Sequence, residues 1–572
     1  MNEPYEPPQS DPSSPPSAEA PESPIEATPK RWPVTLKILA GLSTVFAVVF
    51  GAAFAFPSAA EDLTSFGADM ILMNAVLTAM PLMLLWILWV LFLSGWKWRS
   101  RFLTLFMIGA TPWVFLQLFE PVLGGDATIV GWRPFWMDAP EVKRESVTPP
   151  PTGVDLTTES ETDFPRFLGS NQNGVVSKSG PFSEENFENA RELWKQPVGH
   201  GWSGFVARNG FAVTMEQREQ FECVTCYEIE TGKLQWVYEH EERHYDYLGK
   251  TGPRSTPLIA NGLVYAMGAN GNLVCLNGSD GSVAWQKDLN ELLKIKLADN
   301  VDGDGVAVRK EAQSRLVWGR SGSPLIVNDT LFIPGGGSIG GAIHTLLAFD
   351  PTTGDLKWKG GKEMISYASP VVATVAGRQQ ILLTAESKAM GFDPTDGTVL
   401  WTFDRPGHTG QDANASQISV VGDDTVMTSK GYNDGGGELI RLEAKGDSIV
   451  PSSVWRNERA IKTKLTSPVL YQGHAYSFSN GFLECARLSD GKRIWKARGK
   501  FGHGQILLAG SQLLAHSEFG ELYLVDAAPS GFRSHGKIST VEGICWNTLC
   551  LTGNRVIVRS NLEAACYELP TE

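Results

Sequence analysis

The sequence predicts an all-β fold, an eight-bladed β-propeller of four-stranded antiparallel blades, preceded by three transmembrane α-helices and a disordered N-terminal tail. Three observations predict it: a turn motif that ends in tryptophan and recurs through the C-terminal part, a spacing of about 47 residues per unit, and three long apolar runs near the N-terminus. A chain of 572 residues is too long for one ordinary domain but suits a repetitive one. Seven blades are the alternative count.

The repeated motif places a glycine four residues before a tryptophan and, in five copies, a small residue ten before it. The five clear copies are Cys226–Trp236, Cys275–Trp285, Ala348–Trp358, Gly391–Trp401 and Cys485–Trp495, and a degenerate sixth copy ends at Trp455. Glycine supplies the positive φ that a tight hairpin turn needs. Each copy therefore predicts a strand, a turn and a return strand.

A second hairpin signal precedes most copies, which gives four short strands per unit, as in a propeller blade. The hairpin signals begin at Gly204, Ser255, Gly322, Ala368, Ser416, Thr466, Gly504 and Cys545, so Leu193–Leu569 divides into eight blades of about 47 residues. The last copy stops at Cys566–Pro570 without a tryptophan strand, whereas an orphan strand, Leu193–Val198, precedes the first blade. We expect this orphan strand to complete the last blade and close the ring.

Three apolar runs within residues 34–119 are predicted to be transmembrane helices: Val34–Phe56, Met70–Leu93 and Phe102–Phe119. Roughly 20 helical residues cross the hydrocarbon layer of a bilayer. Basic residues flank the start of the first run and fill the loop before the third, whereas acidic residues flank the other ends. The positive-inside rule then places the N-terminus in the cytoplasm and the chain after residue 119 outside it.

The composition of the remaining segments predicts their structural class. Residues 1–33 contain ten prolines and are predicted to be a disordered cytoplasmic tail. Residues 120–162 are predicted to be an extracytoplasmic linker, and residues 163–572 to be the propeller. The net charge of −14 argues against a broad nucleic-acid-binding surface, because phosphate binding needs a basic face.

The phased tryptophan copies, with their D-x-x-[TSD]-G turns, resemble the quinoprotein-type propeller repeat, also called the PQQ-like repeat after pyrroloquinoline quinone. That family includes PQQ-dependent dehydrogenases and the BamB scaffold of outer-membrane β-barrel assembly. The resemblance covers residues 163–569, and Asp163–Val175 resembles the segment that often precedes such propellers in bacterial exported proteins. It implies the propeller fold and leaves the activity open.

One insertion in the blade series, near residues 288–312, carries a calcium-like pattern. Asn300, Asp302 and Asp304 occupy positions 1, 3 and 5 of an EF-hand loop, the backbone of Val306 position 7, and Glu311 position 12. A short helix is predicted before it, over residues 289–298. We expect these residues to bind Ca²⁺ and to stabilise the insertion, with a solvated acidic turn as the alternative.

The cysteines and one histidine pair have structural explanations. Cys226, Cys275, Cys485 and Cys566 fall in the small-residue position of the repeat, where neighbouring blades pack closely. Cys545 and Cys550 can face each other across a hairpin, and an extracytoplasmic location would permit a bond between them. The segment from His240 to His244 matches H-E-x-x-H, but no helix is predicted to place both rings on one face, so we expect a loop between blades.

These observations favour a non-enzymatic scaffold in a bacterial cytoplasmic membrane, with no catalytic residues and with a protein or cell-envelope partner bound at a propeller face. The alternative is a membrane-bound PQQ-dependent dehydrogenase that oxidises an alcohol or a sugar. Resemblance to those enzymes implies catalytic and calcium-binding acids and, in many of them, two adjacent cysteines. No adjacent pair exists in the chain, and the acids match no motif, so we do not expect PQQ as a cofactor.

Overall fold

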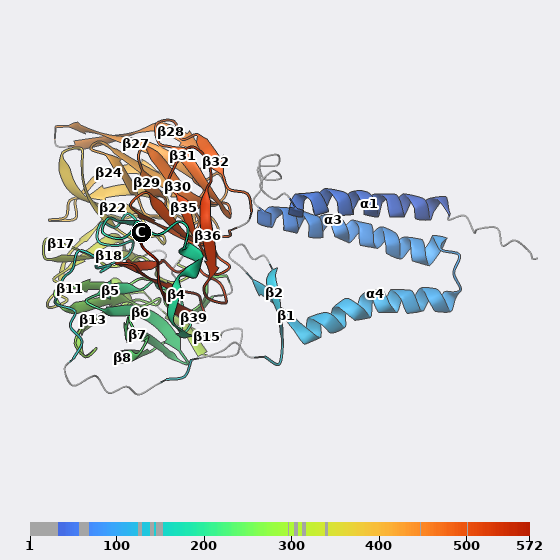
Figure 1. The fold of residues 1–572 in the computed structure, drawn as a ribbon, viewed down its shortest axis with the longest axis horizontal. Coiled ribbons are helices and arrows are strands. Elements are labelled where there is room, and N and C mark those ends of the chain that lie inside the picture. Colours follow the sequence, from blue (N-terminus) through green and yellow to red (C-terminus); the bar gives the residue numbers. More distant parts are fainter. Residues whose placement is uncertain are drawn as a thin grey trace, which may run out of the picture.

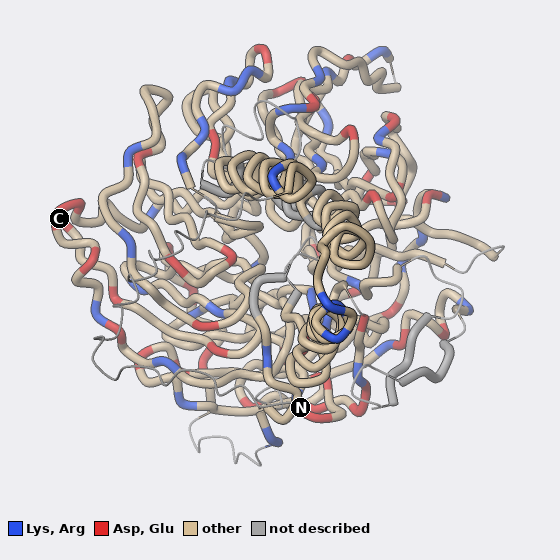
Figure 2. The backbone as a smooth tube through the Cα atoms, turned by 90° about the vertical axis from the view of Figure 1, so that its right-hand side faces the viewer, with Lys and Arg blue, Asp and Glu red and all other residues tan. Residues whose placement is uncertain are grey.

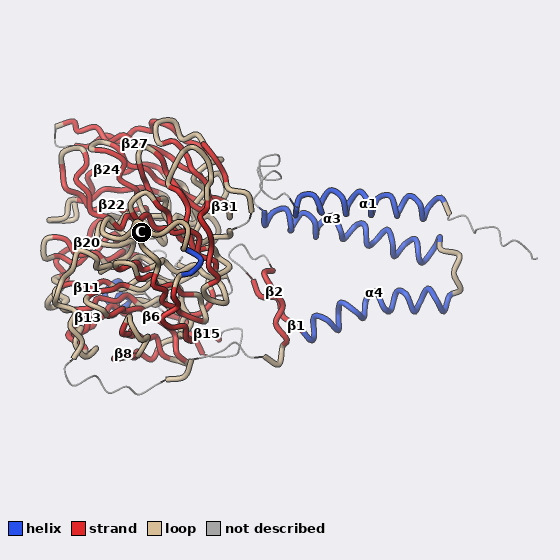
Figure 3. The backbone as a smooth tube through the Cα atoms, viewed as in Figure 1, coloured by secondary structure: helices blue, strands red, loops and turns tan. Residues whose placement is uncertain are grey.

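A computed structural model describes residues 33–55, 68–123, 129–137, 142–144, 153–246, 248–295, 297–301, 307–311, 316–337, 341–446, 448–499 and 501–572. A body built of strands carries helices that project from one side of it (Figures 1 and 3). Of the predicted disordered tail, residues 1–32 lie outside the described residues.

Eight sheets of at least four strands form the body (Figure 1). Apart from β3 and β4, each of their strands pairs antiparallel with its sequence neighbour. Blades 1 to 4 comprise β5 (Val206–Arg208), β6 (Phe211–Arg218), β7 (Phe221–Glu228) and β8 (Leu234–Glu241); β11 (Leu258–Ala260), β12 (Leu263–Met267), β13 (Asn272–Asn277) and β14 (Val283–Asp288); β17 (Leu325–Val327), β18 (Thr330–Gly337), β19 (Ile343–Phe349) and β20 (Leu356–Gly360); and β21 (Val371–Val375), β22 (Arg378–Thr384), β23 (Lys388–Phe392) and β24 (Val399–Asp404).

The second half of the ring follows the same plan. Blades 5 to 8 comprise β25 (Ser419–Gly422), β26 (Thr425–Lys430), β27 (Gly436–Lys445) and β28 (Ser448–Asn457); β29 (Val469–Tyr471), β30 (His474–Ser479), β31 (Phe482–Arg487) and β32 (Arg493–Lys496); β33 (Gln505–Ala509), β34 (Gln512–His516), β35 (Glu521–Asp526) and β36 (Ser534–Ser539); and β37 (Cys550–Thr552), β38 (Arg555–Arg559), β39 (Glu563–Glu568) and β4 (Arg191–Pro197). The prediction of eight antiparallel four-stranded blades is confirmed.

The ring closes where the two ends of the repeat region meet. Strand β4 pairs antiparallel with β39, and Trp194 stands opposite Cys566. The predicted orphan strand therefore supplies the outer strand of blade 8, as expected. The apolar core lies between neighbouring blades; at the junction of blades 1 and 2, for example, Val213, Val224 and Trp236 pack with Val264 and Val274.

Blade tryptophans join each blade to the next. Trp236 stands opposite Cys226 in the β7–β8 ladder, so a small residue faces the indole. Its Nε1 donates to the carbonyl of Gly278 in the turn of blade 2, 2.9 Å away. The ring lies against Gly281 of that turn, where a Cβ would come within 2.6 Å of the indole. Gly281 also has a φ of +74°, so both the turn and the packing require glycine.

The same contact between a tryptophan ring and a turn glycine recurs at Trp194–Gly232, Trp285–Gly354, Trp358–Gly397 and Trp455–Gly491. Trp495 instead donates to the carbonyl of Ala528 at 2.8 Å. The recurring motif of the sequence is therefore the bond between blades, and its period is the period of the ring.

Two blades depart from this pattern. Trp401 of blade 4 donates to Oε1 of Gln380 in its own blade, at 2.7 Å, because the β27–β28 ladder of blade 5 continues to Lys445↔Ser448 and moves its turn away. Blade 7 has Gly536 where the others have tryptophan. Blade 8 has no covalent turn between β39 and β4, so blade 7 has no turn to receive an indole.

The segment before the repeat packs on the propeller. Val154 and Leu156 are buried in the core between blades 1 and 2, although the predicted linker extends to residue 162. Strand β3 (Val175–Val176) pairs parallel with β33 and makes blade 7 five-stranded, and the short η2 (Phe187–Asn189) contacts β36. Nearer the helices, β1 (Phe119–Leu123) and β2 (Ile129–Pro134) form a hairpin within the predicted linker, and β9 (Tyr245–Asp246) with β10 (Lys250–Thr251) forms another on blade 1.

Helices occupy the three predicted apolar regions: α1 (Val34–Ala55), α3 (Ala68–Leu88) extended by the π-helical η1 (Trp89–Leu93), and α4 (Trp98–Leu118). Within the described residues, two helical stretches, not three, have the length and apolarity of a membrane span: Val34–Ala52 and Trp98–Leu118. The predicted 70–93 span differs, because its described apolar part is the shorter stretch Leu77–Leu93 and η1 interrupts the α-helix.

Candidate functional site

A cavity of about 460 Å³ lies on the axis of the ring, among the segments that lead into the innermost strands. Eight of its lining residues lie within four residues of the start of an inner strand, one for each blade: Trp202, Thr256, Ser321, Ser369, Ala415, Leu465, Gln505 and Thr548. The ring closure therefore creates the cavity, because no single blade could enclose it.

Residues 164–176 cross the ring beneath this cavity. Phe164 forms a bridge with Ala207 of blade 1, and the side chain of Gln172 donates to the carbonyl of Pro370 beside blade 4 at 3.3 Å. Val175 pairs with Leu508 of blade 7. Within this segment Phe167 lines the cavity. We call residues 164–176 the plug, since they reach blades on opposite sides of the ring and close one end of the cavity.

Aromatic rings form two walls of the cavity. Trp202 and Trp546, which lead into blades 1 and 8, have ring centroids 4.3 Å apart. Trp318 and Tyr367, which lead into blades 3 and 4, stack with centroids 5.0 Å apart. The ring centroids of Tyr432 and Trp318 are 6.1 Å apart. The Trp202 indole donates to the carbonyl of Gly249 at 2.7 Å, which holds this ring in place.

Arg254 is the charged residue among the described lining residues of the cavity. Its Nη1 donates to the carbonyl of Gly252 at 2.5 Å, and its Nη2 donates to Gly249 at 2.5 Å and to Lys250 at 2.8 Å. Desolvation lowers the pKa of the Arg254 guanidinium to about 10, against the opposing effect of Asp246, so the side chain stays charged at neutral pH. Among the described residues, no carboxylate lies within ion-pair distance of it.

The described lining contains no Asp, Glu, His or Cys. His, Asp and Glu are the most common general acids and bases, and Ca²⁺ prefers carboxylate oxygens. The lining therefore does not fit the calcium-assisted quinone chemistry of the alternative prediction. It can bind a ligand through flat apolar surfaces and one cation.

The predicted calcium loop is only partly within the described residues. Asp302, Asp304 and Val306 lie outside them. Asn300 and Glu311 lie on β15 (Leu297–Val301) and β16 (Ala307–Glu311), which pair antiparallel with Leu297 opposite Glu311. The predicted helix over residues 289–298 is shorter than expected: α5 covers Leu289–Leu293 and ends at Lys294, whose backbone is left-handed.

The other sequence motifs are separate from the cavity. His240 pairs with Glu242 at 3.5 Å, whereas the Nδ1 of His244 contacts Asn270 Oδ1 at 2.7 Å. The H-E-x-x-H match thus begins on β8, which includes His240 and Glu241, and only its second half lies in the predicted loop. Its two histidines make no shared site in the described residues. All seven cysteines are buried thiols, including Cys545 and Cys550.

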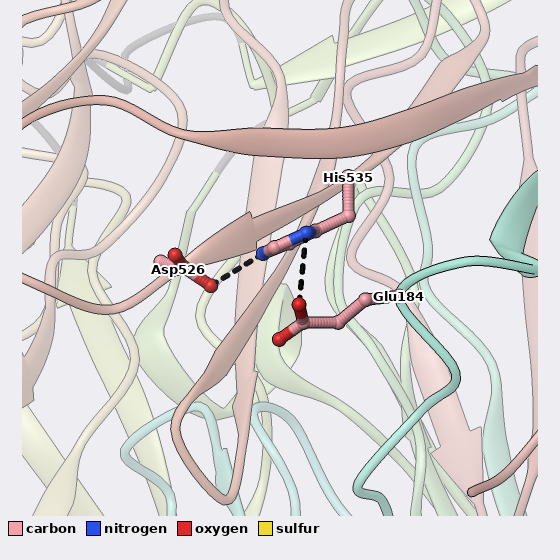
Figure 4. A group of neighbouring side chains, drawn as sticks. All are labelled: Glu184, Asp526 and His535. Atoms are coloured by element: carbon pink, nitrogen blue, oxygen red, sulfur yellow. Dashed lines mark hydrogen bonds and ion pairs between the residues drawn. The ribbon is translucent and has the colours of Figure 1, made fainter.

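Glu184, Asp526 and His535 form one further cluster of possible metal ligands (Figure 4). His535 Nε2 lies 2.6 Å from Asp526 Oδ1, and its Nδ1 lies 3.2 Å from Glu184 Oε2. The ring thus lies between the two carboxylates, and Arg533 lies within 3.9 Å of both. Contacts of His535 and Arg533 thus connect Glu184 in the N-terminal segment to Asp526 on blade 7.

Sequence reasoning missed the cavity residues because Trp202, Arg254, Trp318, Tyr367 and Trp546 share no local motif. A usable signal was present in the S-P and T-P pairs that open several inner strands. These pairs locate the axis-facing end of each blade, so the polar and aromatic residues just before them were candidates for an axial site.

A family model described as "Outer membrane protein assembly factor BamB" matches residues 186–497. The chain is 29% identical over 104 residues to the outer membrane protein assembly factor BamB of Alkalilimnicola ehrlichii, a match that covers 18% of this chain and 23% of that protein. The chain thus spans about a quarter of the length of this curated relative.

Solved structures share the propeller fold at low sequence identity. A quinohemoprotein alcohol dehydrogenase from Pseudomonas putida superposes with a TM-score of 0.52 and 10% identity, covering 74% of this chain and 83% of that one. BamB from Moraxella catarrhalis superposes with a TM-score of 0.45 and 12% identity, covering 66% of this chain and 100% of that one. At 10% identity the similarity to the dehydrogenase establishes the fold alone.

Proposed function

Because the chain belongs to the outer membrane protein assembly factor BamB family, we propose that it is a non-enzymatic scaffold of the bacterial cell envelope. In this proposal the propeller lies outside the cytoplasm and binds a protein or another envelope component at one face. The N-terminal helices anchor it in the cytoplasmic membrane.

The composition of the axial cavity carries the proposal. A cavity of about 460 Å³ falls in the size range of ligand sites. Its described lining offers aromatic rings, small polar residues and Arg254, but no His, Asp or Glu for general acid–base catalysis and no carboxylate to ligate a metal. Such a lining favours binding over turnover.

The membrane anchor is supported by the exposure of the helices. In α4 no residue is buried within the protein, although Phe102, Phe106 and Trp113 are large and apolar. The helices α1 and α3 contact each other through Trp86, whose indole donates to Ser43 at 3.0 Å. Figure 2 views the helices nearly end-on, with Lys and Arg spread around the propeller behind them and no single basic face in this view. Lipid is the solvent that suits such helices.

Two experiments test the proposal on the full chain, the first in nanodiscs and the second in cells. The first adds PQQ and Ca²⁺ and measures bound chromophore and dye reduction with alcohols and sugars. We expect neither a stoichiometric chromophore nor turnover, and substrate-dependent dye reduction would establish the dehydrogenase alternative.

The second experiment places protease-cleavable tags at the N-terminus and after Pro151 in cells. We expect external protease to cut only the tag after Pro151, and cleavage of both tags would exclude the proposed topology.

A further inference from the structure

We infer that the axial cavity binds a ligand that carries an aromatic ring and a carboxylate. This inference rests on the proposed binding function and specifies its ligand chemistry. The ligand is either a free aromatic acid or the C-terminal aromatic residue of a partner polypeptide, because both present the same ring and the same negative charge.

The requirement for a negative charge on the ligand follows from the hydrogen bonding of Arg254. A guanidinium has five N–H groups, and three of the five donate to the carbonyls of Gly249, Lys250 and Gly252. No acceptor among the described residues takes the other two. The backbone contacts hold the cation at the cavity wall. Asp246 and Glu222 act on it electrostatically from outside the lining, but no described carboxylate pairs with it directly, and the described lining itself carries no negative charge. The two that remain are the Nε–H and one Nη1–H, which lie on different edges of the guanidinium, so a carboxylate would accept a charge-assisted hydrogen bond from one of them.

The requirement for an aromatic ring in the ligand follows from the aromatic walls of the cavity. Trp202 and Trp546 form one aromatic pair, and Trp318 and Tyr367 form another across the axis. Aromatic pairs gain energy beyond area burial when a further ring joins them in an offset or edge-on geometry. Leu248 lines the cavity and is 40% exposed, and Val317, the chain neighbour of the lining residue Trp318, is 43% exposed, so apolar side chains continue from the lining to the surface.

The closed end limits the shape of the ligand. The plug passes under the cavity and Phe167 contributes to the lining there. A polypeptide therefore cannot thread through the ring, whereas a chain terminus or a small molecule can enter from the open side. The volume of about 460 Å³ accommodates a small ligand or a few residues.

The test measures binding of matched acid and amide probes to the full chain in nanodiscs by calorimetry. The probes are N-acetyl-L-phenylalanine and its amide, and the peptide Ala-Ala-Ala-Phe with a free or amidated C-terminus. We expect each acid to bind about tenfold more tightly than its amide, as is typical when one charge-assisted hydrogen-bonding partner is removed. Equal affinity of acid and amide, or no saturable binding of either acid, would overturn the inference.

Variants locate the binding. Arg254→Gln is expected to reduce the ratio of amide Kd to acid Kd to about one, Arg254→Lys to keep part of it, and the exposed control Arg441→Gln to leave it unchanged. Ala415→Trp is expected to fill the cavity and weaken acid and amide alike. Because the ratio is taken within each protein, a general loss of loop order does not mimic the loss of charge recognition.

The probes also separate the two sources of the ligand. Tighter binding of the peptide acid than of N-acetyl-L-phenylalanine indicates a polypeptide terminus, and the reverse indicates a free aromatic acid. The scaffold proposal has its own readout, which is a photocrosslink from a probe at Leu248 to an envelope component, with a probe at Val283 on the outer strand of blade 2 as control. A crosslink that persists in the Ala415→Trp variant, together with equal acid and amide affinities, removes the cavity inference and leaves the scaffold.

Discussion

The Trp194 indole donates its N–H to the carbonyl of Ile229 across 2.7 Å, although the two residues lie in the last and first blades. The ring covers Gly232 in the same turn. This contact repeats the one that joins covalently consecutive blades, so the closing junction is built like the others. Closure by β4 therefore adds both a ladder of backbone hydrogen bonds and a tryptophan contact between blades.

Replacing Gly232 with Ala is expected to destabilise the closed ring. Its φ is +71°, and an added Cβ would lie 2.7 Å from Cδ2 of Trp194. Positive φ costs a non-glycine residue about 1–2 kcal/mol, and overpacking adds about 1–3 kcal/mol. We expect a clear fall in the urea midpoint of the full chain, measured by tryptophan fluorescence.

Gly210→Ala is the matched control, because Gly210 has a φ of +81° and nothing lies within 4 Å of its added Cβ. We expect this variant to lose only the part of the unfolding free energy that the positive φ accounts for. Equal midpoints for the two variants would mean that the Trp194 contact contributes nothing to closure.

Glu222 is expected to make stability depend on pH. Its carboxyl is buried at the junction of blades 1 and 2 and accepts from the backbone N–H of Ala269 at 2.9 Å. Burial, reinforced by Glu242, raises its pKa to about 7, although the Ala269 bond, His240 and Arg254 oppose the rise. A folded-state pKa above the unfolded value means that the stabilisation is full below the unfolded value near 4.5 and is lost as pH rises through 7.

Glu222→Gln removes this titration while it keeps an acceptor oxygen for Ala269. The variant should match the wild type in stability near pH 5 and exceed it by about 3 kcal/mol above pH 8, since one pKa unit corresponds to about 1.4 kcal/mol. Thermal unfolding between pH 5 and 8.5 measures the difference, with the exposed Glu241→Gln as control. A difference that does not change with pH would contradict the prediction.

The propeller was predictable because one physical requirement repeats along the chain. Five of the blade tryptophans pack on a glycine turn of the next blade. Each blade between two such contacts therefore carries both a turn glycine and a tryptophan at a short, repeated spacing, as in Gly281 and Trp285. Even the missing tryptophan of blade 7 follows this rule, since blade 8 has no covalent turn. The cavity lacked such a signal: Trp202, Arg254 and Trp546 meet only after the ring closes, and their distance along the chain carries no information about the contact.

The plug is expected to depend on Gln172. This residue is 5% exposed, its Nε2 donates to Pro370, and its own carbonyl accepts from Gln417. Gln172→Ala leaves the Pro370 carbonyl without its partner, which costs about 1–3 kcal/mol for a buried polar group. We expect faster hydrogen exchange across residues 164–176 and little change in the outer strands.

Gln379→Ala is the control for this measurement, because Gln379 is an exposed blade 4 glutamine whose side chain contacts Asn328 at 2.9 Å. It should leave exchange in the plug unchanged. Unchanged exchange in Gln172→Ala as well would show that the plug is held by its apolar contacts, such as Phe164, and by its pairing with β33.

The calcium loop stays a prediction that metal titration can test. If Asn300, Asp302, Asp304, the Val306 carbonyl and Glu311 bind Ca²⁺, adding the ion should raise the melting temperature of the full chain, because a ligand that binds only the folded state stabilises it. Glu311→Gln should abolish that rise by removing the carboxylate of position 12. Glu291→Gln, in the first turn of α5 close to the loop, should retain it. An identical Ca²⁺-dependent rise in Glu311→Gln would exclude this loop as the metal site, because the position-12 carboxylate supplies two of the oxygens that an EF-hand-type ion requires.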